Sequence, residues 1–208
     1  MSYEPLPEGE LAAVVTYLEM LEPPDGPAMD SPLSLRRVER PQPDAYRALF
    51  RRIGARWLWF SRLLLDDSRL AAVIAHPGVE LHAVVDASGA DCGIVELDFR
   101  QAGECELAFI GLVPELAGKG HGRWLLAEAL RLAWRPDVRR VHVHTCTLDH
   151  PAALAAYVRA GFRPYRQGIE RFRDPRLLGV LPVDCAPQVP LLGTLASAER
   201  SPRDANCA

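Results

Sequence analysis

Hydrophobic and polar residues alternate, or form short apolar runs between turn residues, in six segments of the chain. Both patterns are typical of β-strands, whose side chains point alternately to the two faces of a sheet. The first segment is rich in β-branched residues and is ended by Pro23 and Pro24. The patterns predict strands over residues 11–21, 81–85, 92–99, 104–113, 140–147 and 163–172.

Apolar residues recur at helical spacing in four other segments. The first begins at Asp44 and places Tyr46, Leu49 and Phe50 on one face, and Gly54 is expected to break or kink this helix. The other predicted helices run from 66 or 67 to 75, from 122 to 133, and from 151 to 161 with Asp149 or His150 as the cap. Residues 22–40 contain four prolines and predict a loop.

Length and charge narrow the classes of protein that fit these elements. The chain has 208 residues and a net charge of −3 with both signs interspersed, so we expect no nucleic-acid partner. The first residues show no basic region followed by an apolar run, and no segment has the length of a membrane span, so we expect a cytoplasmic protein without a membrane partner. The five cysteines lack C-x-x-C spacing and favour free thiols.

Residues 112–126 carry the most informative motif of the chain. A predicted strand ends at Val113 and Pro114, three glycines follow at 118, 120 and 122, and an amphipathic helix begins directly behind them. Glycines let a ligand approach the backbone, and the first amides of a helix are unpaired donors with a partial positive charge. This arrangement is typical of an anion site, most often for phosphate. A glycine-rich connection that only packs the helix on the sheet is the alternative.

Two phosphate loops do not fit the motif. A Walker loop has Lys and then Ser or Thr after its last glycine, where this chain has Arg123 and Trp124, and the dinucleotide fingerprint has a different glycine spacing. Residues 117–122 instead resemble the acetyl-CoA loop of the GCN5-related N-acetyltransferases (GNAT), with the pattern Q/R-x-x-G-x-G/A. Ala117 stands where that family usually has Gln or Arg.

A second family signature follows downstream. The family pattern N-x-x-A-x-x-x-Y-x-x-x-G-F is matched by Ala153, Tyr157, Gly161 and Phe162, while His150 takes the place of Asn. The two signatures are separated by one predicted helix and one predicted strand, in the family's order. The chain is therefore similar to this family over roughly residues 79–172.

The resemblance implies an α/β (α+β) fold, with a mixed, mostly antiparallel twisted sheet and helices on both faces. Its fourth and fifth strands are expected to splay apart and admit acetyl-CoA. We expect a single GNAT-like domain over residues 1–173 and a Pro- and Ala-rich extension over 174–208 with a disordered end. The residues expected to bind acetyl-CoA are Leu112, Val113, Gly118, Lys119, Gly120, His121, Gly122, Arg123 and His150. In particular, the amides of Leu112 and Val113 are expected to pair with the pantetheine arm.

Two side chains are candidates for catalysis. Tyr157 is expected to protonate the thiolate that leaves when an amine attacks the thioester. Strand alternation places Glu104 and Glu106 on one face with Ala108 and Ile110, where burial and like charge are expected to raise a carboxyl pKa. By the resemblance, Glu106 corresponds to a catalytic glutamate that accepts a proton directly or through water, and a bulge in this strand would shift the face assignment.

The acceptor stays open between a protein N-terminus, a lysine, a polyamine and a small amine. The aromatic run at Trp57–Phe60 is interpreted either as core packing between helices or as part of an acceptor pocket. His142, His144 and His150 lack the spacing of a metal site, so no metal is predicted. A homodimer is possible, and the alternative to an enzyme is a non-catalytic acyl-CoA-binding, regulatory or partner-binding module.

Overall fold

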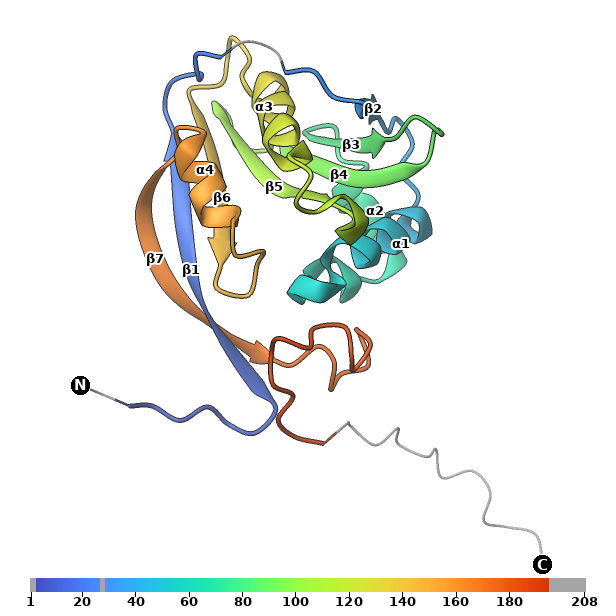
Figure 1. Ribbon diagram of the computed structural model, residues 1–208, viewed down its shortest axis with the longest axis vertical. Helices are drawn as coiled ribbons and strands as arrows, with labels where there is room; N and C mark the ends of the chain where they lie inside the picture. Colours follow the sequence, from blue (N-terminus) through green and yellow to red (C-terminus); the bar gives the residue numbers. More distant parts are fainter. Residues whose placement is uncertain (1–2, 27–28, 195–208) are drawn as a thin grey trace, which may run out of the picture.

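The computed structural model describes residues 3–26 and 29–194. Figure 1 shows a twisted sheet with helices on both faces. The strands are β1 (Glu10–Met20), β2 (Ser34–Arg37), β3 (Val79–Val85), β4 (Asp91–Asp98), β5 (Glu104–Leu112), β6 (Arg140–Cys146) and β7 (Arg163–Arg173). The helices are α1 (Pro43–Gly54), α2 (Asp67–Ile74), α3 (His121–Ala133) and α4 (Ala153–Arg159). The predicted fold class is confirmed.

The seven strands form one sheet in the order β2-β3-β4-β5-β6-β1-β7. The strand β2 corrects the prediction of a loop over residues 22–40, because Ser34–Arg37 pairs with the outer edge of β3. Four residues are too few to show a period, and Pro32, two positions before the strand, favours a loop. With β2 counted, the strands expected to splay are the fifth and sixth.

The pairing between β5 and β6 is parallel and very short. It joins only Glu104–Glu106 to Arg140–His142, whereas every other neighbouring pair in the sheet is antiparallel. Beyond this contact β5 stays paired with β4 alone and β6 with β1 alone. The two strands therefore diverge towards the start of α3, and backbone edges face each other across the gap.

A β-bulge at Ala108 changes which residues of β5 share a face. Leu97 pairs with Leu107, but the preceding Glu96 pairs with Phe109, so Ala108 has no partner on β4. Phe109 therefore joins Glu106 on the face that α1 covers, and Ile110 points to the opposite face. The predicted alternation of Glu106 with Ala108 and Ile110 is wrong beyond the bulge.

Helix α1 packs on one face of β4 and β5, while α3 lies over the opposite face (Figure 1). Phe50 is fully buried, and its ring contacts the rings of Trp59 and Phe109. The predicted break at Gly54 is confirmed because α1 ends there. A side chain at Gly54 would meet the Trp59 ring at 2.5 Å, so the glycine lets the following turn fold back.

A buried polar group ties α1 to the sheet. Glu96 of β4 has no exposed surface, and its two carboxylate oxygens accept hydrogen bonds from Tyr46 of α1 and from Arg62. The Arg62 guanidinium also lies 5.1 Å from the centre of the Phe109 ring. Burial, followed by the charge of Glu96, raises the pKa of Tyr46 well above its ordinary range, so this phenol stays a donor.

The first part of the C-terminal extension packs against the domain. Leu181 and Ala186 form a second small core with the buried Leu58. Arg176 is 2 % exposed, pairs with the equally buried Asp174, and donates to the carbonyls of Ala186, Val189 and Pro190. Residues 174–194 are therefore held on the domain, and the predicted disordered end lies outside the described residues.

Replacing Arg62 with methionine tests the buried group. Arg62→Met leaves the Glu96 carboxylate buried with only the Tyr46 hydroxyl as a partner, so we expect the free energy of unfolding to fall by about 3–5 kcal/mol in urea titrations. The matched control is Arg36→Met, which breaks the exposed ion pair with Asp91 and should cost at most about 1 kcal/mol. Equal losses in the two variants would contradict the assigned role of Glu96.

Candidate active site

A large cavity opens where β5 and β6 diverge. It has a volume of about 1530 Å³, and its wall is formed by residues 107–113 of β5 and its end, by the glycine loop and α3, by residues 143–146 of β6, and by α4. The segment Arg56–Ser61 and the β7 residues Glu170 and Phe172 complete the wall on the other side of the sheet. The cavity therefore passes through the sheet at the gap between the two strands.

The glycine loop presents unpaired amides to this cavity. Gly118 and Gly120 adopt φ angles of 73° and 83°, which favour glycine strongly over other residues. Within the described part of the chain, the amides of residues 118–122 have no hydrogen-bond acceptor, and α3 has no side-chain cap. Gly122 has an ordinary φ, and a side chain there would meet no atom within 4 Å. Packing among the described residues therefore does not require a glycine at this position.

Most of the expected ligand-binding residues line the cavity. The structure places Leu112, Val113, Gly118, Gly120, Gly122, Arg123, His150 and Tyr157 on its wall. Lys119 and His121 belong to the loop but are not part of this wall, and neither is Glu106. These three side chains lie beside the cavity.

The Val113 amide was expected to bind the ligand, but it already forms a hydrogen bond within the sheet. It donates to the Cys92 carbonyl of β4 at 2.9 Å, and the Val113 carbonyl accepts from Leu116 at 3.0 Å. This backbone is therefore not available to a ligand, contrary to the expectation for Val113. Because neighbouring peptide groups point to opposite edges of a strand, the amide of Leu112 points towards the gap.

Tyr157 reaches the cavity from α4. The helix begins at Ala153, later than the predicted start at Pro151, because residues 149–152 form a turn in which the Ala152 amide donates to His150 Nδ1 at 3.1 Å. The Tyr157 ring is half-buried and packs edge-on against Phe162 at 5.8 Å. Burial, with a smaller effect of the Asp149 charge, raises the pKa of Tyr157 above its ordinary value of 10.0. The hydroxyl is therefore protonated at neutral pH.

Glu106 forms a pair with His144, which sequence reasoning did not place in the site. His144 Nδ1 lies 3.3 Å from Glu106 Oε1, across the point where β5 and β6 separate. This hydrogen bond lowers the pKa of Glu106 and raises that of His144, and in each group it outweighs the opposing effect of burial. The expected rise in the Glu106 pKa is therefore wrong. The neighbour that acts on Glu106 is the basic His144, whereas the like-charged Glu104 binds Arg140.

The aromatic run Trp57–Phe60 both packs and lines the cavity. Leu58 adopts φ 56° and ψ 36°, an unusual conformation for leucine, and this turn sends Leu58 into the second core and Trp59 into the main one. The Trp59 indole N–H donates to Asp149, which also accepts from Thr145 and the Cys146 amide. The run therefore joins the α1 side of the cavity to the turn before α4.

A comparison of the sequence with protein families decides the membership of the chain. Residues 39–162 match the model of the acetyltransferase (GNAT) family. The chain belongs to the GNAT family. The matched span contains both signatures and the helix and strand between them, while β1, β2 and β7 lie outside it. No curated protein matches the chain at a significant level.

Solved structures share the GNAT fold at low sequence identity. A GCN5-related N-acetyltransferase from Sphaerobacter thermophilus superposes with a TM-score of 0.56 at 19 % identity, over 80 % of this chain and 52 % of its own. A functionally unknown conserved protein from Staphylococcus epidermidis has a TM-score of 0.53 at 14 % identity, over 80 % of this chain and 63 % of its own. The chain thus spans only about half to two thirds of these two proteins. Spermidine N-acetyltransferase from Vibrio cholerae, in complex with CoA and spermine, has a TM-score of 0.54 at 23 % identity, over 68 % of this chain and 94 % of its own.

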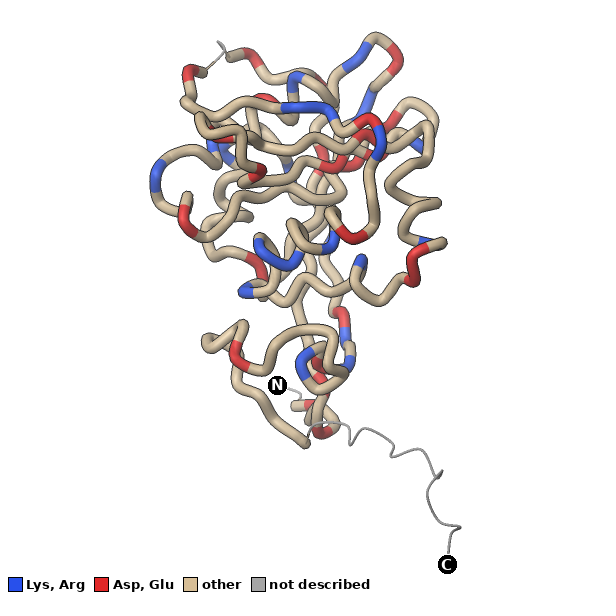
Figure 2. The backbone as a smooth tube through the Cα atoms, turned by 90° about the vertical axis from the view of Figure 1, so that its right-hand side faces the viewer, with Lys and Arg blue, Asp and Glu red and all other residues tan. Residues whose placement is uncertain are grey.

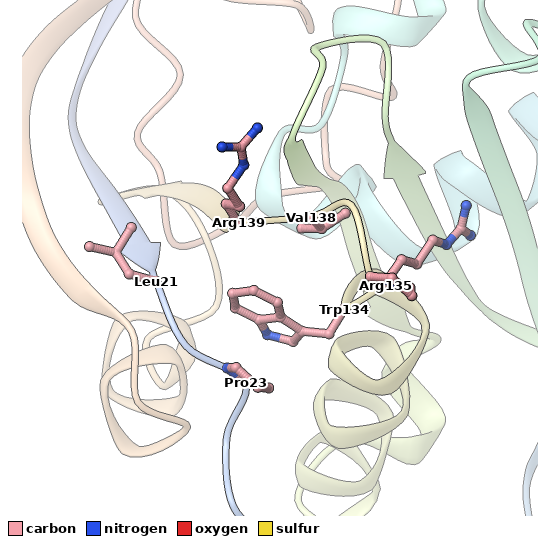
Figure 3. Close-up of a pocket in the computed structure, with 7 residues that line it drawn as sticks. Leu21, Pro23, Trp134, Arg135, Val138 and Arg139 are labelled. Atoms are coloured by element: carbon pink, nitrogen blue, oxygen red, sulfur yellow. The ribbon is translucent and has the colours of Figure 1, made fainter.

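A second, smaller cavity of this GNAT protein lies at the far end of α3. It has a volume of about 470 Å³ and places the Trp134 ring between Leu21 and Pro23 (Figure 3). Its two arginines do not converge on it, because Arg135 pairs with Glu80 and stacks on the Phe99 ring, while Arg139 points away in the close-up. This cavity lacks the convergent polar groups of a ligand site.

Other classes of site find little support in the described residues. Basic and acidic residues alternate along the backbone without a continuous basic stretch (Figure 2). In residues 3–26 and 29–194 no helix is long and apolar enough to cross a membrane. Across the same residues, no group of three or more His, Cys, Asp or Glu side chains could hold a metal ion.

The pair of Glu106 and His144 predicts a pH dependence. The raised pKa of His144 contributes stability below pH 6.5 that is lost as the pH rises through its folded value, and the lowered pKa of Glu106 contributes stability above pH 4.5 that is lost in acid. In NMR titrations we expect the His144 midpoint above 6.5, and a lower midpoint in Glu106→Gln. An unchanged midpoint in that variant would show that the two side chains are not coupled.

Proposed function

We propose that this GNAT protein is an N-acetyltransferase that moves an acetyl group from acetyl-CoA to a primary amine by direct attack. The observation that carries the proposal is the cavity between β5 and β6, which leads from the aromatic wall through the sheet to the unpaired amides of the glycine loop. Two substrates can enter such a passage from opposite faces and meet at the gap. Family membership supports acetyl transfer as the reaction.

The residues of the loop fit the phosphates of acetyl-CoA. Five consecutive amides without acceptors and the positive end of α3 suit a pyrophosphate, and Arg123 adds a positive charge on the cavity wall. The Leu112 amide points to the open edge of β5, where it would bind the pantetheine arm. His150 has its Nδ1 occupied by the Ala152 amide, which leaves Nε2 for the arm. Bound acetyl-CoA supplies the thioester carbonyl that the amine attacks.

Two groups of the chain move protons in the proposed reaction. Tyr157 protonates the departing sulfur, which is consistent with a half-buried phenol whose raised pKa keeps its proton in place at neutral pH. Glu106 assists removal of the proton from the acceptor ammonium. Holding both reactants side by side in the cavity removes much of the entropy cost of their encounter.

The acceptor is proposed as a primary amine. The Vibrio cholerae protein of similar fold is named for spermidine, which places a polyamine among the amines to test. The acceptor would enter along Trp57, Phe60 and Phe172, where Glu170 supplies a negative charge beside the rings. Release of free CoA from acetyl-CoA across a panel of amines identifies the acceptor.

Gly120→Ala tests the loop as the pyrophosphate site. The new methyl group meets no protein atom, but alanine is strained at a φ of 83°, so we expect the free energy of unfolding to fall by about 1 kcal/mol. The methyl group projects from the loop that would hold the pyrophosphate, so acetyl-CoA binding measured by calorimetry should weaken by about tenfold or more. Gly89→Ala in the turn between β3 and β4, with a φ of 85° and equally open space, is the matched control and should bind normally at a similar cost in stability. Normal binding by Gly120→Ala would remove the loop from the site.

Tyr157→Phe tests the general acid. The variant keeps the ring that packs on Phe162 but loses the hydroxyl, so we expect kcat to fall by about 10²-fold or more with little change in acetyl-CoA affinity. Tyr3→Phe removes an exposed phenol and is the control. Unchanged turnover would disprove the role of Tyr157. Acetyl-CoA binding by the unaltered protein without turnover on any amine would instead favour a non-catalytic acyl-CoA-binding module.

A further inference from the structure

The side chain that faces the acceptor half of the cavity is His144, not Glu106. His144 lines the cavity and has 49 % of its side chain exposed, whereas Glu106 is absent from the wall and is 32 % exposed. Both lie at the end of the short β5–β6 contact, where the next residues of the two strands have no partner across the gap. A group that takes a proton from an amine in the cavity must reach the amine, and the imidazole is the one so placed.

We propose that His144 is the general base for the acceptor amine and that Glu106 acts behind it as a positioning residue. The inference rests on the proposed function and assigns the proton-accepting step of the same site. His144 Nδ1 lies 3.3 Å from Glu106 Oε1, and this neighbour favours the neutral tautomer with its proton on Nδ1 and its lone pair on Nε2. Glu106 thereby sets the tautomer and stabilises the imidazolium once a proton has arrived.

The surroundings of His144 favour the protonated imidazole over the neutral imidazole. Glu106 on β5 contacts it, and the charges of Asp149 in the turn before α4 and of Glu170 on β7 also raise its pKa. The centre of the Tyr17 ring on β1 lies 5.8 Å from the centre of the imidazole. The Arg166 guanidinium also packs on this ring, 4.0 Å from its centre. His142, the next residue on the same face, opposes the charge, but it pairs with Glu104 at 3.5 Å. Three acids therefore stabilise the proton that His144 accepts.

The proposed step balances in protons and bonds. His144 Nε2 takes one proton from the acceptor ammonium, and the freed lone pair forms the C–N bond to the thioester carbon. The C–S bond then breaks, and Tyr157 protonates the sulfur while the second proton leaves the attacking nitrogen and restores the phenol. The products are the amide and the free thiol of CoA, and the imidazolium releases its proton to solvent through its exposed edge.

The test compares three variants of the full-length protein with the amine that responds in the panel. His144→Gln should lower kcat/KM by about 10²-fold or more and remove the acidic limb of the pH profile. Glu106→Gln should lower it less and move that limb to lower pH, because the ring loses its anionic partner. The double variant should be no slower than His144→Gln, since Glu106 acts only through the ring.

His142→Gln is the matched control, because it removes an imidazole from the same face of β6 that does not line the cavity. It should keep both the rate and the pH profile. If Glu106→Gln is slower than His144→Gln, and slows the reaction further in the His144→Gln background, Glu106 itself is the base and the inference is wrong. Turnover unaffected by His144→Gln overturns the inference alone. No turnover by the unaltered protein overturns the proposed function and the inference together.

Discussion

The short parallel contact between β5 and β6 is the constraint on which the rest of the structure depends. Three residues of each strand pair, and the strands then separate while each stays paired with an antiparallel neighbour on its other side. The bulge at Ala108 adds to the divergence and turns Phe109 towards α1. A sheet that continued its pairing would have no passage between its faces. The cavity therefore follows from the topology of the sheet.

Polar side chains cluster at the end of that contact, on the same face of the sheet as α1. The Glu106–His144 pair lies there, beside Glu104 and His142, and Arg140 binds both Glu104 and Glu19. On the other face, α3 and α4 bring the glycine loop and Tyr157 to the same gap. The two faces thus carry different chemistry, with amides and a phenol on one and an acid–imidazole pair on the other.

Much of the fold is readable from the sequence because its signals are local. Strand alternation, the glycine loop and the Tyr157 signature each lie within one or two neighbouring elements, and Gly54 marks the end of α1 through its contact with Trp59. The strand β2 could not be predicted from the sequence, because four residues show no period and they form a strand only by pairing with the edge of β3. The exact start of α4 depends on the turn at His150, which propensity does not reveal.

The parts of the site that sequence reasoning misses are set by contacts between distant residues. His144 and Glu106 are 38 positions apart (144 − 106), and only the register of β5 against β6 brings them together. The same register explains why the pKa of Glu106 is lowered by a basic partner. The Val113 amide is lost to Cys92 for an equally non-local reason. Residues 174–194 look featureless in the sequence, yet Arg176 holds them against the domain beside Leu58.

The central claim is that the gap between β5 and β6 and the glycine loop together form one binding passage for acetyl-CoA. Amide chemical shifts during titration of the ¹⁵N-labelled protein with acetyl-CoA test it most directly, because they report each backbone position separately. The account predicts the largest shifts at residues 118–123 and at Leu112, smaller shifts near His144 and Tyr157, and none at the β2–β3 edge. Shifts confined to the Trp134 cavity, or no shifts at millimolar acetyl-CoA, would contradict it.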